Sequence, residues 1–97
     1  MYIVLSKFGT TLISRQLGKE AYSAFKPRLG ELKDNEKLEV DFEGVNTFSP
    51  SWGDEFLTPL IDGFGDRVVL MNTQNPSVKL TVNLLEDINK KKFLILS

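Results

Sequence analysis

Apolar and polar residues recur with two different periods along this chain, and the periods divide it into strands and helices. Residues 2–5 form a short apolar run of strand formers, and residues 67–71 form a continuous apolar run typical of a strand buried on both faces. In residues 38–42 apolar and acidic residues alternate, which predicts a strand with one buried face. The apolar run at residues 93–96 predicts a final short strand or an apolar tail.

Two longer segments have the three-or-four-residue period of amphipathic helices, residues 14–32 and residues 50–64. Each contains a proline. Pro27 predicts a kink or a break into two shorter helices, and Pro59 should bend or shorten the second helix. The first apolar face is predicted to comprise Leu17, Ala21, Phe25, Leu29 and Leu32. The second is predicted to comprise Trp52, Phe56, Leu60 and Phe64, with Leu57 and Ile61 beside them.

Residues 77–92 fit both periods. Positions 78, 80, 82 and 84 alternate as in a strand, whereas positions 78, 82, 85 and 88 fit a helix. We predict a helix because Asn75-Pro76-Ser77 is typical of a helix start, and because Glu86 and Asp87 continue the pattern.

Strands that alternate with helices predict an α/β fold, a small two-layer sandwich with a four-stranded, mostly parallel sheet and about three helices. With 97 residues the chain should form a single domain over residues 1–97. The acidic residues that alternate in residues 38–42 suggest that one face of the sheet is incompletely covered. The order of the strands does not follow from the sequence.

The clearest local signal joins the central strand to the second helix, within Lys37 to Phe56. Gly44 permits a turn after the strand, and Ser49-Pro50-Ser51 supplies hydroxyls and a proline where a helix needs an N-cap and a first residue. Ser51 and Asp54 have capping-box spacing. Gly53 is costly inside a helix, so we expect a neighbouring element to approach the backbone closely there.

The runs V-D-F-E-G-V and S-P-S-W-G-D-E-F resemble the STAS-like domains of bacterial and phage proteins, which are related in fold to anti-sigma factor antagonists. Further resemblance lies at Phe8-Gly9, at residues 12–15, at residues 68–72 and at Ser77-Val78, so it spans nearly the whole chain. It implies helices gathered on one side of the sheet, and it agrees with a helix at residues 77–92.

In the parent STAS group, an Asp-Ser-Ser-Gly run at a helix start carries a serine that a partner kinase phosphorylates. Ser49-Pro50-Ser51-Trp52 occupies the corresponding place here, so the resemblance implies that Ser51 is the modified position. The other three positions depart from the Asp-Ser-Ser-Gly pattern.

Composition narrows the choice of function. The chain has no cysteine and no histidine, which excludes thiolate catalysis, cysteine-bound zinc and histidine general-base chemistry. We therefore predict a non-enzymatic function without a cofactor. The net charge of −1 gives no support to nucleic-acid binding. The N-terminus lacks the pattern of a signal peptide and no apolar run is long enough to span a membrane, so a cytoplasmic location is expected.

Each candidate site residue has a structural and a functional interpretation. Ser49 or Ser51 could simply cap the helix, or either could be phosphorylated, Ser51 first. Phe48 and Trp52 could belong to the core or, if exposed together, could bind a protein partner together with Asp54 and Glu55.

Other polar residues suggest further sites. Asp41, Asp54 and Glu55 could gather into a magnesium site, and Arg15 could instead pair with Asp54 or Glu55. Residues 9–15 could cradle a phosphate, although they lack the glycines and lysine of a P-loop. The lysines at 90–92 could touch an acidic partner, but a helix C-terminus favours cations in any case.

These observations predict a regulatory protein–protein interaction module of STAS-like type, with Ser51 as a switch set by an ATP-binding, kinase-like partner. One alternative is a nucleotide-binding sensor with a pocket near residues 9–15. Another is a small carboxylate- or metal-dependent enzyme that uses Asp41, Asp54 and Glu55. Self-association is also open, because residues 93–96 could pair with another chain if they lie on a sheet edge.

Overall fold

Within residues 1–96, four parallel strands form the main sheet, in the order β1-β3-β5-β6. In this computed structural model, residues 1–96 are described. The strands are β1 (Tyr2–Val4), β3 (Leu38–Asp41), β5 (Val68–Met71) and β6 (Leu94–Leu96). The α/β architecture and the four-stranded parallel sheet predicted from the sequence are confirmed.

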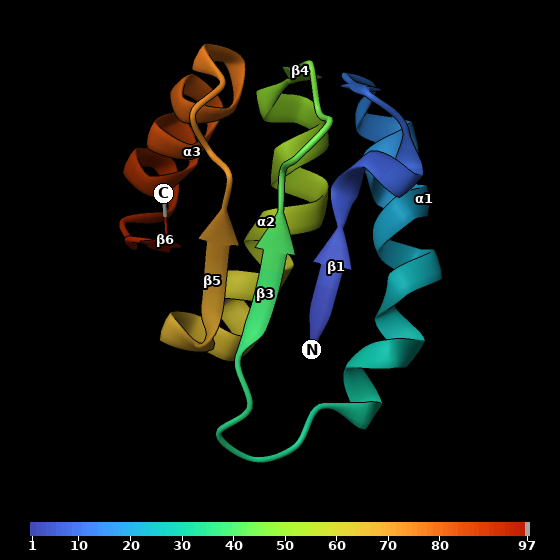
Figure 1. Cartoon of the computed structure of the whole chain (residues 1–97), viewed down its shortest axis with the longest axis vertical. Helices are drawn as coiled ribbons and strands as arrows, with labels where there is room; N and C mark the ends of the chain where they lie inside the picture. Colours follow the sequence, from blue (N-terminus) through green and yellow to red (C-terminus); the bar gives the residue numbers. More distant parts are fainter. Residues whose placement is uncertain (97) are drawn as a thin grey trace.

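Three α-helices connect the strands in the described part of the chain, and Figure 1 shows them gathered on one face of the sheet. They are α1 (Arg15–Phe25), α2 (Pro50–Phe64) and α3 (Pro76–Asn89). The strand order increases steadily from β1 to β6, so right-handed crossovers place every helix on the same side. The result is the predicted two-layer sandwich.

Short elements complete the chain. Three 3-10 helices are present among residues 1–96, η1 (Leu5–Phe8), η2 (Lys26–Glu31) and η3 (Gly65–Arg67). A second, two-stranded parallel sheet joins β2 (Thr11–Leu12) to β4 (Thr47–Phe48). The sequence pattern predicts only a turn at residues 8–11, because strands of two residues are too short to show a period.

The two faces of the main sheet differ in what covers them. One row across the sheet joins Ile3, Val40 and Leu70, which are buried beneath the helices. The adjacent row lies on the opposite face. It runs from exposed Tyr2 through half-buried Glu39 and buried Val69 to exposed Leu94. The prediction that one sheet face is incompletely covered is therefore confirmed.

Two glycines allow the helices to pack closely. A Cβ atom at Gly18 of α1 would lie 2.8 Å from the carbonyl oxygen of Trp52 in α2. At Gly53 of α2, an added Cβ would lie 3.0 Å from the Phe48 ring and 3.1 Å from the Leu85 side chain of α3. The close approach predicted at Gly53 is confirmed, whereas the closer one at Gly18 was not predicted.

The prolines act differently in the two helices. The break predicted at Pro27 is confirmed, because α1 ends at Phe25 and the chain continues as the 3-10 helix η2. Pro59 does not shorten α2, which runs unbroken to Phe64.

One predicted position of the first apolar face is wrong. Leu17 is 58% exposed, whereas Gly18 and Ala21 of the same helix are buried. Within residues 1–96 no helix has the length and apolar character needed to cross a membrane.

Candidate functional site at the start of helix α2

The side chain of Ser49 has a structural role at the start of α2. Its hydroxyl oxygen accepts a hydrogen bond from the Trp52 N–H at 3.2 Å, which caps α2, and its O–H donates to the Ile13 carbonyl at 2.6 Å. Pro50 follows as the first helical residue, where its missing N–H costs nothing. The cap predicted for this helix is therefore Ser49, and the same hydroxyl also ties α2 to the segment before α1.

Ser51 is in a different position. It lies in the first turn of α2, half-exposed, and its hydroxyl makes no hydrogen bond to any residue between 1 and 96. The sequence left open whether Ser49 or Ser51 caps the helix. Ser49 is the cap, and the Ser51 hydroxyl does not contribute to capping. Loss of the Ser51 hydroxyl would therefore break no hydrogen bond within residues 1–96.

Phe48 and Trp52 are 1% and 2% exposed. The Phe48 ring contacts those of Phe42 and Trp52, with centroids 4.9 and 5.9 Å apart, and Trp52 stacks on Phe56 at 5.1 Å. The joint exposure on which their partner-binding interpretation depended is absent. These two side chains support the helix start from within the core, and they do not form part of its surface.

Arg15, Asp54 and Glu55 come together on that surface. One guanidinium nitrogen of Arg15 lies 3.1 Å from Asp54 Oδ2 and 2.6 Å from Glu55 Oε2, so the pairing predicted between α1 and α2 is confirmed with both partners. Hydrogen bonds to Asp54 and then to Glu55 raise the pKa of Arg15. Asp54 also accepts a hydrogen bond from Thr58 at 2.9 Å. We call Arg15, Ser51, Asp54 and Glu55 the α2-start surface.

Helix α3 holds the loop that precedes α2. The Phe48 N–H donates to Ser77 Oγ at 2.9 Å, and the Phe48 carbonyl accepts from Thr81 Oγ1 at 2.5 Å. Asn75 caps α3 by accepting from the Ser77 N–H, and its side-chain amide donates to the Asn46 carbonyl at 2.9 Å. The sequence predicts the helix start at Asn75-Pro76-Ser77, but these contacts join positions about thirty residues apart and have no local signal.

Asp41 does not join Asp54 and Glu55. Its carboxylate, which is buried at the end of β3, accepts hydrogen bonds from Asn72 Nδ2 at 2.7 Å, from the Glu43 N–H at 2.9 Å and from the Tyr2 hydroxyl. Burial would raise the pKa of Asp41, but these three donors together lower it.

The Tyr2–Asp41–Asn72 cluster was not predicted, because only the fold brings its three members together. In the part of the chain that the structure describes, no group of three or more acidic residues is placed to hold a metal ion. The possible magnesium site at Asp41, Asp54 and Glu55 therefore does not form, because these three residues are not brought together.

A hollow of about 250 Å³ lies near the segment considered for nucleotide binding. Its lining is mostly apolar, with Glu20 as its charged residue, and Arg15 is already paired with Asp54 and Glu55. No lysine or arginine is among the described residues that line this hollow. Among the lysines at 90–92, Lys91 pairs with Asp62 at 3.0 Å, and Lys92 lies 3.8 Å from Glu86.

The parallel sheet, the three helices on one face and the serine-containing start of α2 define the class of small two-layer α/β domains with STAS-like topology. The family model of the STAS-like domain of unknown function (DUF4325) matches residues 25–78, which is more than half of the chain. The chain belongs to this family. The match extends from the end of α1 to the start of α3 and so includes the start of α2. No curated protein and no solved structure matches the chain.

Proposed function

We propose that this STAS-like domain is a non-enzymatic regulatory module that binds a protein partner through the α2-start surface. In this proposal, phosphorylation of Ser51 by an ATP-binding, kinase-like partner is the switch. The observation that carries the proposal is the state of the Ser51 hydroxyl, which is half-exposed on the first turn of a firmly anchored helix and makes no hydrogen bond within residues 1–96.

The charges around Ser51 make a phosphate there effective. A phosphoserine adds about −1.5 to −2 charges at neutral pH, which the positive end of the helix dipole tolerates. It also repels the neighbouring carboxylates of Asp54 and Glu55 and competes with them for Arg15. Modification therefore rearranges the ion pairs of the surface while the buried core below it stays in place.

A capture experiment tests the interaction. The purified protein, its Ser51→Asp variant and a Ser23→Asp control are each used to bind proteins from a lysate of the source cells. Ser23 is exposed on α1 and lies outside the α2-start surface, so the control adds the same charge elsewhere. We expect a partner that the wild-type protein and Ser23→Asp retain and that Ser51→Asp loses. A partner retained equally by all three would contradict the role of this surface.

The modification is tested separately. The wild-type protein, Ser51→Ala and Ser49→Ala are incubated with the lysate and ATP, and peptide mass spectrometry locates any added phosphate. We expect phosphate on wild type and on Ser49→Ala, and none on Ser51→Ala. Phosphate on Ser49 alone would overturn the assignment of the switch to Ser51. A rise in melting temperature with purified ATP or GTP and no lysate would favour the nucleotide-sensor alternative.

A further inference from the structure

Thr73 is a buried residue whose hydroxyl has no hydrogen-bond partner within residues 1–96. It follows β5 in the loop before α3, and it is 5% exposed. The other buried polar side chains of the described chain all make hydrogen bonds, and these are the side chains of Asp41, Thr81 and Glu86. No hydrogen bond involves the Thr73 side chain. Its oxygen is nevertheless accessible, since no fully enclosed side-chain nitrogen or oxygen among residues 1–96 lacks a partner. A buried but accessible group without a partner is available to a ligand.

The space that Thr73 reaches is a hollow of about 360 Å³. Residues of α3 and Ile95 of β6 complete its lining, and Figure 1 shows α3 and β6 together at one side of the molecule. The volume lies within the range of small-molecule sites, about 300–1,000 Å³. Because Thr73 closely follows the last residue of β5, the hollow also lies near the carboxyl end of a parallel strand, where open α/β sheets bind ligands. Size and position both favour a small molecule as the occupant.

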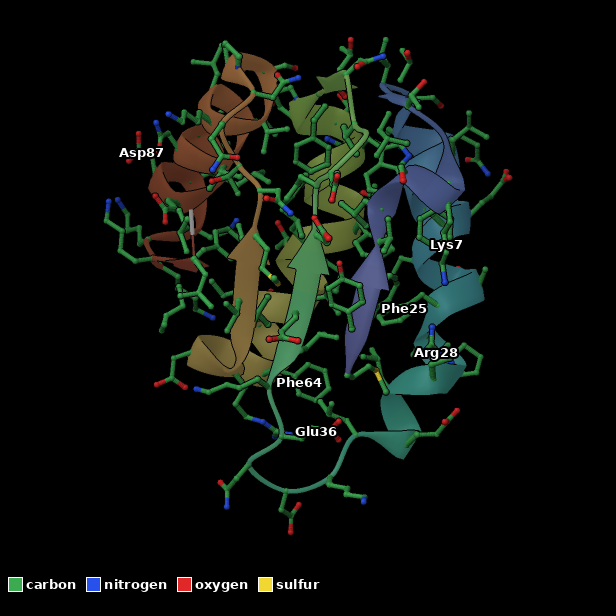
Figure 2. The ribbon with its side chains drawn as sticks, in the orientation of Figure 1. Lys7, Phe25, Arg28, Glu36, Phe64 and Asp87 are labelled. Carbon is green, nitrogen blue, oxygen red and sulfur yellow. The ribbon has the colours of Figure 1, made fainter. Side chains whose placement is uncertain are left out.

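The polar side chains that line the hollow can all donate hydrogen bonds. Lys79 and Asn83 lie one turn apart on the same face of α3, and neither side chain makes an ion pair or a hydrogen bond within residues 1–96. The Lys79 ammonium, the Asn83 amide and the Thr73 hydroxyl can each donate to an anion. No carboxylate is among the described residues of the lining, and Figure 2 shows Asp87, one turn beyond Asn83, on the outer side of α3. The lining therefore favours an anionic group.

We propose that this hollow binds a small carboxylate that carries a short hydrocarbon chain. The carboxylate accepts hydrogen bonds from Thr73 and Lys79, and the chain packs on Val82 and Ile95, the apolar side chains of the lining. One lysine balances the single charge of a carboxylate, whereas a phosphate monoester brings about −1.5 to −2 charges at neutral pH. The described lining includes no residue of the α2-start surface, so this site is separate from the interaction proposed above.

Hexanoate is the probe for the first test, and hexanamide is the matched neutral molecule. Isotope-labelled protein is titrated with each, and two-dimensional NMR follows the backbone amides. We expect hexanoate to shift the signals of residues 73–83 and of Ile95 in a saturable way. Hexanamide should bind roughly tenfold more weakly, because it lacks the charge that strengthens a hydrogen bond from lysine. Acetate, which has the head group without the chain, should also bind more weakly. Tighter binding of hexyl phosphate than of hexanoate would overturn the choice of a carboxylate.

Two variants test the residues that hold the head group. Thr73→Val removes the hydroxyl at nearly constant shape, and we expect it to weaken hexanoate binding several-fold. Because the hydroxyl has no partner within residues 1–96, this variant should melt at or above the temperature of the wild type. Lys79→Met removes the charge but keeps an apolar stem, and it should weaken binding roughly tenfold. Lys19→Met is the control, since Lys19 is exposed on α1 and does not line the hollow.

Four outcomes would overturn the proposal. The first is the absence of a saturable shift around the hollow with hexanoate, as expected if the hollow holds only water. The second is equal affinity for hexanoate and hexanamide, and the third is unchanged affinity in both Thr73→Val and Lys79→Met. The fourth is an equal loss of affinity in Lys19→Met, which would place the binding site elsewhere.

Discussion

At the residue scale, Gly18 is the glycine at which an added Cβ would lie closest to a neighbouring atom. A Cβ there would meet the carbonyl oxygen and Cα of Trp52 at 2.8 and 2.9 Å, and backbone atoms cannot move aside as a side-chain tip can. We expect Gly18→Ala to lower the free energy of unfolding by about 1–3 kcal/mol or more, as overpacking does. Chemical denaturation measures the change.

Gly63 provides the control for that substitution. It is an exposed residue of α2 with no atom within 4 Å of an added Cβ, so Gly63→Ala removes only backbone freedom. We expect it to be neutral or to stabilise the protein by roughly 0.5–1 kcal/mol. If Gly18→Ala and Gly63→Ala lower the free energy of unfolding equally, close contact with α2 is not the reason why a glycine is needed at position 18.

Single residues also show where sequence reasoning fails. Leu17 fits the apolar period of its segment but is mostly exposed, because the buried face of α1 is rotated toward Gly18, which allows close contact with α2. A small residue that permits helix packing leaves no hydrophobic signal. Asp41 was recognised as a site candidate, but its partners are Tyr2 of β1 and Asn72, which follows β5, and spacing along the chain could not predict that they meet.

At the scale of the element, replacing Ser49 at the start of α2 should reduce the stability of the protein more than replacing Ser51. Ser49→Ala removes the cap and the bond to Ile13, so we expect a loss of about 1 kcal/mol. Ser51→Ala removes no hydrogen bond made within residues 1–96 and should stay within about 0.5 kcal/mol of the wild type. Thermal unfolding of both variants tests the pair, and an equal loss at Ser51 would contradict the assignment of the cap.

Elements long enough to show a period were predictable. The alternation in residues 38–42 identified β3, and the proline and serines identified the start of α2 to the residue. The ambiguous segment was resolved correctly as α3 by its starting residues, because its apolar positions satisfy both periods. The pair β2 and β4 has two residues in each strand, so only its pairing in the fold defines it.

At the scale of the whole molecule, stability should fall at both ends of the pH range. Three donors lower the pKa of Asp41, and the Lys33 N–H followed by the N-terminal ammonium lowers that of Glu36. Both carboxylates therefore stabilise the fold above their unfolded pKa values of about 4, and this contribution is lost as the pH falls through the folded values.

The hydroxyl of Tyr2 acts in the opposite direction. Its hydrogen bond to Asp41 raises the pKa of Tyr2, so its contribution is present below its unfolded pKa of about 10 and is lost as the pH rises through the folded value. We expect Tyr2→Phe to weaken the alkaline decline in melting temperature and to raise the pKa of Asp41 toward its usual value. Tyr22→Phe is the control, and an identical pH profile for the two variants would contradict this assignment.

The fold class of the whole molecule was predictable from the sequence, but the order of the strands in the sheet was not. Alternating strands and helices indicated a two-layer α/β sandwich, and the right-handed crossover rule then allowed helices on one or both faces. The observed order β1-β3-β5-β6, which decides that all three lie on one face, depends on contacts among distant segments.

The hydrogen bonds from α3 to the Phe48 backbone have a consequence for recognition. With Ser77 on its N–H and Thr81 on its carbonyl, the peptide before α2 is held from outside its own helix. Under the proposed function, a partner that binds the α2-start surface meets residues whose conformational entropy has already been lost on folding, so its binding energy need not be spent on ordering that surface. Substitution of Ser77 or Thr81 should therefore weaken binding at a surface to which neither residue belongs.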